Sequence, residues 1–85
     1  MVPAHALTVL ARIREANGEA PPGFVPHRHF GNREQLVPEG RYLEYDVHPK
    51  VEGQNRGAER LIIDQESGRA FYTNDHYRSF EPISE

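Results

Sequence analysis

A change of hydrophobic period near residues 17–23 constrains the fold of this chain more than any other feature. Before this stretch, apolar residues recur three and four positions apart, as on a helix with one buried face. They are Ala6, Val9, Leu10, Ile13 and Ala16. The stretch itself, NGEAPPG, combines a helix-ending Asn-Gly with two prolines. After it, apolar and polar residues alternate, so we predict one N-terminal helix, beginning near Pro3, followed by a sheet.

Four later segments have the composition of strands, and we predict strands at 41–48, 58–64, 69–75 and 78–83. The second and third are joined by QESG, a hairpin turn in which Gly68 can adopt a positive φ. The last belongs at an edge, because Pro82 has no N–H to donate to a ladder. One helix followed by antiparallel strands indicates a single α+β domain over residues 1–85, with the helix covering the apolar face of the sheet.

The alternation also predicts which side chains share the opposite face. Leu43 and Tyr45 point to one face of their strand and Glu44 to the other. In the next strand Leu61 points to the same apolar face, and Arg60 points to the other face of the sheet. Glu44 and Arg60 therefore occupy the same free face if the two strands pair in compatible register.

Length and charge narrow the classes of function. An 85-residue chain has room for one small core, and it contains no cysteine, which excludes disulfides and zinc sites built on thiolates. A net charge of −3 argues against binding nucleic acid through a broad basic surface, but it allows a focused cationic site. No apolar run reaches the ~20 residues of a membrane span, and the N-terminus lacks the pattern of a signal peptide, so we expect a mature form or an excised domain without a membrane partner.

One set of polar residues has the chemistry needed to cleave RNA through its own 2′-hydroxyl. That reaction requires a base for the hydroxyl proton, cations for the phosphorane and an acid for the leaving 5′-oxygen. Glu44, the pair Arg56 and Arg60, and His76 fit these roles in that order, without a metal ion or other cofactor. Taken singly, each is better explained as a surface or turn residue, the arginines by ion pairs with Glu59, Glu52 or Asp64.

Four blocks in order resemble the guanyl-specific microbial ribonucleases, in particular their small bacterial, streptomycete-type branch in the ribonuclease N1/T1 superfamily. The blocks are HFGNRE (29–34), YLEY (42–45), NRGAERLII (55–63) and YTNDHY (72–77). The resemblance implies the microbial ribonuclease fold, Glu44 as general base, His76 as general acid, and Arg56 and Arg60 as phosphate-binding residues. It implies a base-recognition loop whose substrate-binding residues are Phe30, Asn32, Arg33 and Glu34, together with Tyr77.

Guanine recognition also has a physical basis. A single carboxylate such as that of Glu34 accepts both N1–H and N2–H of guanine, whereas adenine presents an acceptor at N1. Gly31 stands where some relatives carry a polar residue, which points to looser selectivity. The alternatives are a broad or purine-preferring ribonuclease acting as a toxin domain, and a non-catalytic interaction domain with the same fold.

Partners and location follow from the resemblance as expectations. We expect single-stranded RNA as substrate, a barstar-like protein inhibitor, a monomer, and a secreted enzyme whose signal or carrier segment is absent from this chain. His27 and His29 form an H-x-H in a proline-bounded loop without further ligands, so we predict no metal site there. His5 and His48 have the character of surface residues.

Overall fold

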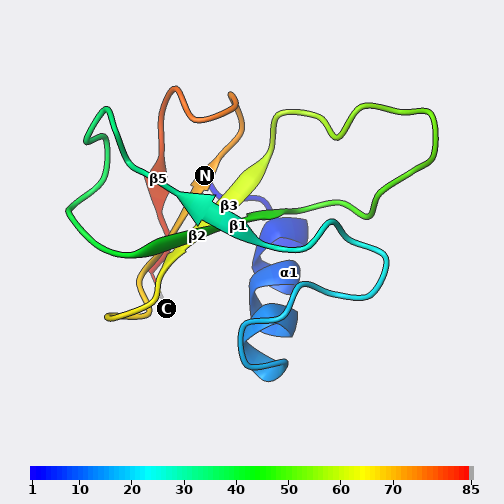
Figure 1. Cartoon of the computed structure of the whole chain (residues 1–85), viewed down its shortest axis with the longest axis horizontal. Coiled ribbons are helices and arrows are strands. Elements are labelled where there is room, and N and C mark those ends of the chain that lie inside the picture. Colours follow the sequence, from blue (N-terminus) through cyan, green and yellow to red (C-terminus); the bar gives the residue numbers. More distant parts are fainter. Residues whose placement is uncertain (85) are drawn as a thin grey trace.

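The computed structural model describes residues 1–84 as one helix and a five-stranded antiparallel sheet (Figure 1). The helix is α1 (Ala4–Glu15). The strands, which lie in the sheet in their sequence order, are β1 (Arg28–Phe30), β2 (Tyr42–Asp46), β3 (Arg60–Asp64), β4 (Ala70–Thr73) and β5 (Glu81–Pro82). This is the predicted α+β fold class. Within residues 1–84, no helix has the length and hydropathy needed to cross a membrane.

The helix begins and ends where the sequence predicts. Pro3 occupies the N-cap position, and Ala6, Val9, Leu10 and Ile13 are buried. Ala16, the last residue of the predicted apolar pattern, is exposed at the C-cap position. After Glu15 the chain reverses through Asn17 and Gly18, both with positive φ, and the Gly18 N–H donates to the Ile13 carbonyl over 2.9 Å. This hydrogen bond satisfies one of the carbonyls that a helix end leaves without a partner.

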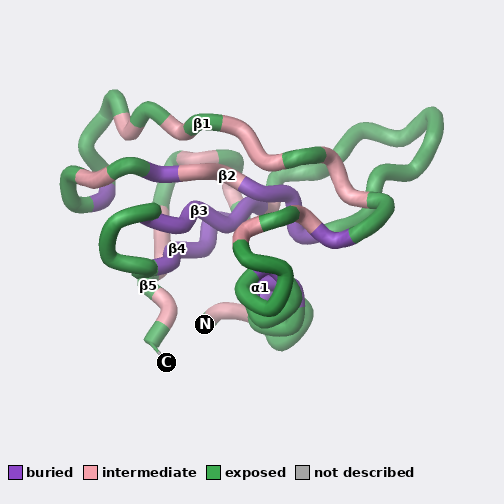
Figure 2. Tube along the Cα trace, turned by 60° about the horizontal axis from the view of Figure 1, so that its bottom comes forward, coloured by how far each residue is buried: buried purple, intermediate pink, exposed green. Residues whose placement is uncertain are grey.

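The register of the central strands confirms the predicted division of faces. β2 and β3 pair so that Glu44 lies opposite Ile62 and Asp46 opposite Arg60. The alternate residues of both strands pack against α1 in the main core. Its buried members are Ala6, Val9, Leu10, Ile13, Tyr45, Val47, Leu61, Ile63, Ala70 and Tyr72. Figure 2 shows the buried trace concentrated in β2, β3 and β4, with α1 covering one side.

The face away from α1 is divided into an apolar part and a charged part. A second buried cluster, consisting of Val37, Tyr42, Ile62 and Phe71, is flanked by Phe30 and Phe80. The charged part lies toward the other end of the same strands, around Asp46 and Arg60. This arrangement leaves an aromatic surface directly beside a cationic one.

The turns and the sheet edge follow the predictions, but the first strand does not. The β3–β4 hairpin has Gly68 at φ 81°, and the proline-containing strand β5 lies at an edge. The prediction of a loop throughout 27–29 was wrong, because Arg28–Phe30 form β1 and pair with β2 in the register Arg28 to Glu44. The three residues of β1 show no strand pattern in the sequence. They form a strand because they pair with β2.

Candidate active site

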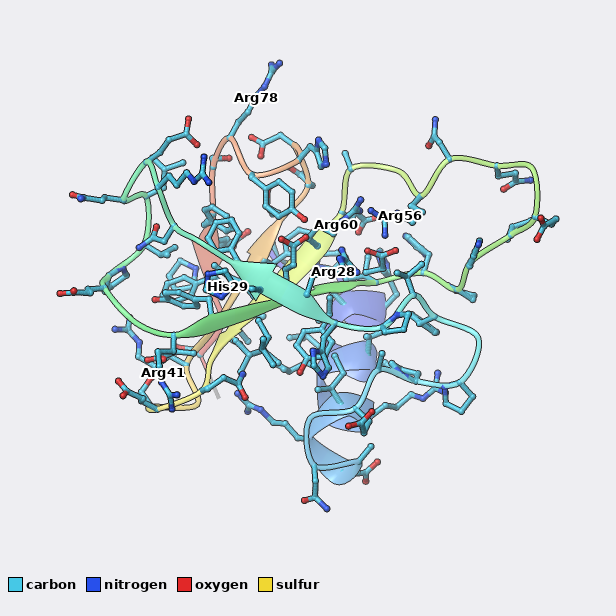
Figure 3. The ribbon with its side chains drawn as sticks, viewed as in Figure 1. Arg28, His29, Arg41, Arg56, Arg60 and Arg78 are labelled. Atoms are coloured by element: carbon cyan, nitrogen blue, oxygen red, sulfur yellow. The ribbon has the colours of Figure 1, made fainter. Side chains whose placement is uncertain are left out.

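The buried carboxylate of Asp46 organises the charged part of the sheet. Its Oδ1 lies 3.0 Å from Arg28 Nη2 and 3.2 Å from Arg60 Nε, and its Oδ2 lies 3.6 Å from Arg56 Nη1. Asp46 and Arg60 are almost fully buried, with side-chain exposures of 2% and 3%. Figure 3 shows Arg28, Arg56 and Arg60 gathered in this region, whereas Arg41 and Arg78 lie at the periphery.

The cluster carries an excess of positive charge. Three guanidinium groups, of Arg28, Arg56 and Arg60, face two carboxylates, those of Asp46 and Glu44, which leaves one positive charge in a chain that is acidic as a whole. Among residues 1–84, Asp46 Oδ2 and Arg60 Nε have no hydrogen-bond partner of good geometry. A buried cation with incomplete hydrogen bonding favours the approach of an anion.

Backbone carbonyls orient the Arg60 guanidinium. Its Nη1 donates to the carbonyls of Gly57 and Glu59 over 3.1 and 2.7 Å. Gly57 has φ 73°, a conformation that favours glycine, and its N–H donates to Asn55 Oδ1 over 2.9 Å. The segment before β3 therefore holds Arg60 in a fixed direction.

Glu44 joins this cluster from the neighbouring position on the same face of β2. Its Oε2 accepts a hydrogen bond from Arg28 Nη2 over 3.0 Å and a short one from the Tyr77 hydroxyl. Burial, together with the hydrogen bond to Glu44 and its negative charge, raises the pKa of Tyr77 to about 12, against the opposing effect of Arg60 and Arg28. The Tyr77 hydroxyl thus remains protonated at neutral pH and donates to Glu44.

The pKa of Arg28 is also raised, so this side chain stays a cation. Partial burial acts to lower the pKa, but the hydrogen bonds and negative charges of Asp46 and Glu44 outweigh it. Arg28 thereby links the two carboxylates of β2 from the adjacent strand.

A loop organised by Asp75 presents His76 and Tyr77. The Asp75 carboxylate accepts hydrogen bonds from the Thr73 and Ser79 hydroxyls and from the N–H groups of Arg78 and Ser79. These hydrogen bonds lower the pKa of Asp75 to about 2. His76 and Tyr77 both have positive φ, at 56° and 75°, a strained conformation for residues with side chains. The Asp75 hydrogen bonds hold the loop in it.

The aromatic part of the face forms a cavity of about 250 Å³. The Phe30 and Tyr77 rings stack with centroids 5.4 Å apart, and Phe80 meets Phe30 edge-on at 5.6 Å. Glu44 lies at the boundary of this cavity. The lining residues are Phe30, Gly31, Asn32, Arg33, Glu34, Leu36, Glu44, Tyr77 and Phe80.

A second hollow gathers the cationic residues. Arg56, Arg60 and His76 line it together with Asn55, Gly57 and Ala58. The His76 N–H donates to the Ala58 carbonyl over 3.0 Å, which ties the Asp75 loop to the segment before β3. The imidazole of His76 lies against the Tyr77 ring, with centroids 4.9 Å apart, so the two hollows meet at these neighbouring residues.

The structure therefore brings every sequence-predicted site residue into one of two adjoining hollows. Asn32 lines the cavity, but its side-chain amide is engaged within its own loop. It donates to the carbonyls of Val37 and Pro38 over 2.9 and 3.4 Å, in a backbone conformation with φ 52°. Asn32 thus shapes the loop that carries the exposed side chains of Arg33 and Glu34.

Sequence reasoning missed Arg28 and Asp46 as parts of the site. Arg28 was assigned to a loop, and its link to Glu44 depends on the β1–β2 register. Asp46 does carry a signal, since it lies two residues after Glu44 and therefore on the same face of the strand. In the part of the chain that the structure describes, Arg56 and Arg60 form ion pairs with Asp46. The predicted alternatives were pairs with Glu52, Glu59 or Asp64.

The chain has well-matched relatives. A protein-family model described as ribonuclease matches residues 1–84. Guanyl-specific ribonuclease St of Saccharopolyspora erythraea is 46% identical over 54 residues, which cover 60% of this chain and 52% of that protein. Guanyl-specific ribonuclease Sa3 of Kitasatospora aureofaciens is 42% identical over 57 residues, covering 64% and 40%. The chain spans about half the length of the curated relatives it matches.

Solved structures share the fold. A crystal structure of ribonuclease Sa2 with guanosine-2′-cyclophosphate superposes with a TM-score of 0.73 at 28% identity, over 98% of this chain and 87% of that one. A second, with exo-2′,3′-cyclophosphorotioate, gives 0.73 at 27% identity, over 98% and 88%. The family match extends over nearly the whole chain, and the fold agrees with it. The chain belongs to the N1/T1 family of microbial ribonucleases.

Proposed function

We propose that this protein is a metal-independent endoribonuclease that cuts single-stranded RNA on the 3′ side of guanosine. The observation that carries the proposal is a continuous line of contacts between the two hollows. It runs from Tyr77 to Glu44, from Glu44 through Arg28 to Asp46, and from Asp46 to Arg60. A carboxylate thus lies between an aromatic cavity suited to a base and a cationic hollow suited to a phosphate.

The chemistry assigns one role to each group. Glu44 takes the proton of the 2′-hydroxyl while the 2′-oxygen attacks the phosphorus. Arg56 and Arg60 stabilise the extra negative charge of the phosphorane. His76 gives a proton to the departing 5′-oxygen, which leaves a 2′,3′-cyclic phosphate and a free 5′-hydroxyl. Hydrolysis of the cyclic ester then reverses the roles, with His76 activating water and Glu44 protonating the 2′-oxygen. All these groups are protein side chains, so the scheme needs no metal ion.

The aromatic cavity supports guanine as the base. Phe30 and Tyr77 provide ring faces for stacking, and Glu34 lies on the lining, where a carboxylate accepts N1–H and N2–H as a pair. The names of the St and Sa3 relatives, and the guanosine cyclophosphate bound to Sa2, support the same assignment. Losing such a paired contact costs about 1–3 kcal/mol, which is enough for a clear preference.

The test is cleavage of a short RNA with one guanosine, in EDTA, beside the same oligomer carrying deoxyguanosine there. We expect a product ending in a 2′,3′-cyclic phosphate from the first and no cleavage of the second, read by mass spectrometry. Glu44→Gln should lower the rate by about 100-fold or more, as for loss of a general base. The control Glu15→Gln changes an exposed carboxylate on α1 and should cleave like the unchanged protein.

Other results would select the alternatives. Cleavage after adenosine at a comparable rate would indicate a purine-preferring enzyme, consistent with Gly31, which supplies no side-chain contact to the base. Binding without cleavage by a folded sample would indicate an interaction domain. Full activity of Glu44→Gln would show that Glu44 is not the general base.

We further propose that the chain acts as a monomeric single domain, and that it is exported or held inactive by an inhibitor, since free RNA cleavage is toxic to a cell. An acidic, barstar-like protein would fit the cationic hollow by presenting carboxylates where a phosphate binds. A pull-down of the chain with such an inhibitor tests this proposal. Arg56→Ala and added salt should both weaken the binding. Unimpaired cleavage in excess inhibitor would contradict it.

A further inference from the structure

A cluster of two histidines and a carboxylate lies outside the active site. His5 belongs to the first turn of α1, His48 follows the end of β2, and Glu59 immediately precedes β3. The Tyr72 hydroxyl, which belongs to the main core beneath α1, donates to Glu59, so the cluster is on the helix side of the sheet. The proposed reaction uses none of these side chains.

The ligand atoms of the cluster converge. His5 Nε2 lies 2.7 Å from Glu59 Oε2, and His48 Nε2 lies 2.7 Å from Glu59 Oε1. The imidazole rings face each other with centroids 5.0 Å apart and a 30° tilt. One ligand atom from each residue falls within 4.8 Å of the other two. Both histidines are about half exposed, at 47% and 52%, so an ion could reach them from solvent.

We infer that His5, His48 and Glu59 form a binding site for one divalent transition-metal ion, with Zn²⁺ the best match. Imidazole nitrogen and carboxylate oxygen are ligands that Zn²⁺ prefers, at about 2.0–2.2 Å. Two ligand atoms of one ion are therefore no more than about 4.2 Å apart, and a small rotation of an exposed imidazole brings the set within that limit. Water completes the coordination from the solvent side.

A further contact supports this assignment. The Tyr72 hydroxyl donates a 2.6 Å hydrogen bond to Glu59 Oε2 and fixes the direction of the carboxylate. Outer-shell partners have this role in metal sites.

Binding there would tie together three segments that are distant in sequence. His5 and Glu59 are 54 positions apart, and His48 and Glu59 are 11 apart. An ion bound only in the folded state stabilises that state by mass action. The site should therefore act on stability rather than on the chemical step.

The test is titration of the purified chain with Zn²⁺ by calorimetry, and with Co²⁺ by visible absorption. We expect one ion per chain, a Co²⁺ spectrum of low coordination number, and a rise of the melting temperature by several degrees at saturating Zn²⁺. His5→Ala and His48→Ala should each weaken binding by more than about tenfold. Both residues are exposed, and circular dichroism verifies that the variants fold.

Two matched controls separate this site from other histidines. His27→Ala and His76→Ala should bind Zn²⁺ like the unchanged chain, since neither residue belongs to the cluster. The inference is overturned if no binding occurs up to about 1 mM Zn²⁺. It is also overturned if binding persists in the His5→Ala/His48→Ala double variant, or is lost in His76→Ala. Because cleavage is assayed in EDTA, these outcomes are independent of the proposed activity.

Discussion

Three arginines from three separate segments share the carboxylate of Asp46. Arg28 comes from β1, Arg56 from the loop before β3, and Arg60 from β3 itself. A buried carboxylate is costly unless it is paired, and the same holds for the nearly buried Arg60. The acid and its cations therefore depend on each other, so a change at Asp46 should act on stability and on the proposed binding of substrate.

Asp46→Asn tests this dependence at a single residue. The amide has almost the same shape but removes the charge that compensates three guanidinium groups, so we expect a loss of unfolding free energy of about 3–5 kcal/mol. Urea denaturation measures it. The control is Glu66→Gln, which removes an exposed pair with Arg41 at 3.4 Å and should cost less than about 1 kcal/mol. Equal losses in the two variants would show that burial of the Asp46 cluster contributes nothing.

At the scale of elements, the loop between β4 and β5 is the clearest link between backbone and function. Asp75 accepts four hydrogen bonds, three from this loop and one from the Thr73 hydroxyl at the end of β4, and the strained residues His76 and Tyr77 follow it directly. In the proposed reaction, the proton donor must reach the leaving oxygen in a defined position. The loop therefore has to be rigid for His76 to act as the proposed acid.

Asp75→Ala should lower the cleavage rate by at least about tenfold while leaving the sheet intact, because a small displacement of the acid His76 slows proton transfer strongly. Single-turnover kinetics and far-ultraviolet circular dichroism check the two parts. The control is Asn74→Ala, which changes the exposed residue next to Asp75 and should keep the cleavage rate of the unchanged protein. A variant of Asp75 with normal rate would mean that other contacts, such as the His76 N–H to Ala58, hold the loop.

The elements also show how much of the fold the sequence could predict. The helix and strands β2 to β5 were predicted because each is long enough to show its period or is marked by Gly68 or Pro82. β1 was missed because three residues are too few to show alternation, and its pairing with β2 is a long-range contact. The same reason explains Asp46, whose partners are known only once the β2–β3 register is fixed. Glu44, Arg60 and His76 were predicted from sequence blocks that resemble the family, and their catalytic roles stay a prediction.

For the whole molecule, the pH dependence of stability reports on Glu59. Its pKa is about 2 in the folded chain and about 4.3 in an unfolded one, so the unfolded state takes up a proton first as the pH falls. This contribution is fully present above about pH 5 and is lost as the pH falls toward 2.

In metal-free buffer, Glu59→Gln should therefore be less stable than the unchanged chain at pH 5, by about 2–3 kcal/mol. The difference should shrink toward zero near pH 2. Urea unfolding at a series of pH values measures it. Tyr72→Phe removes one donor to Glu59 and should give an intermediate pH profile. A difference that stays constant with pH would contradict the assigned role of the charge.

The spread of Asp46's partners along the chain has a consequence for how the protein matures. Arg28, Arg56 and Arg60 come into register only when β1, β2 and β3 have all paired, and His76 arrives with the segment after β4. Early helix formation leaves these groups dispersed. In a refolding experiment, the proposed cleavage activity should thus appear with the slowest step of sheet assembly. A nascent or unfolded chain would then leave the RNA around it intact.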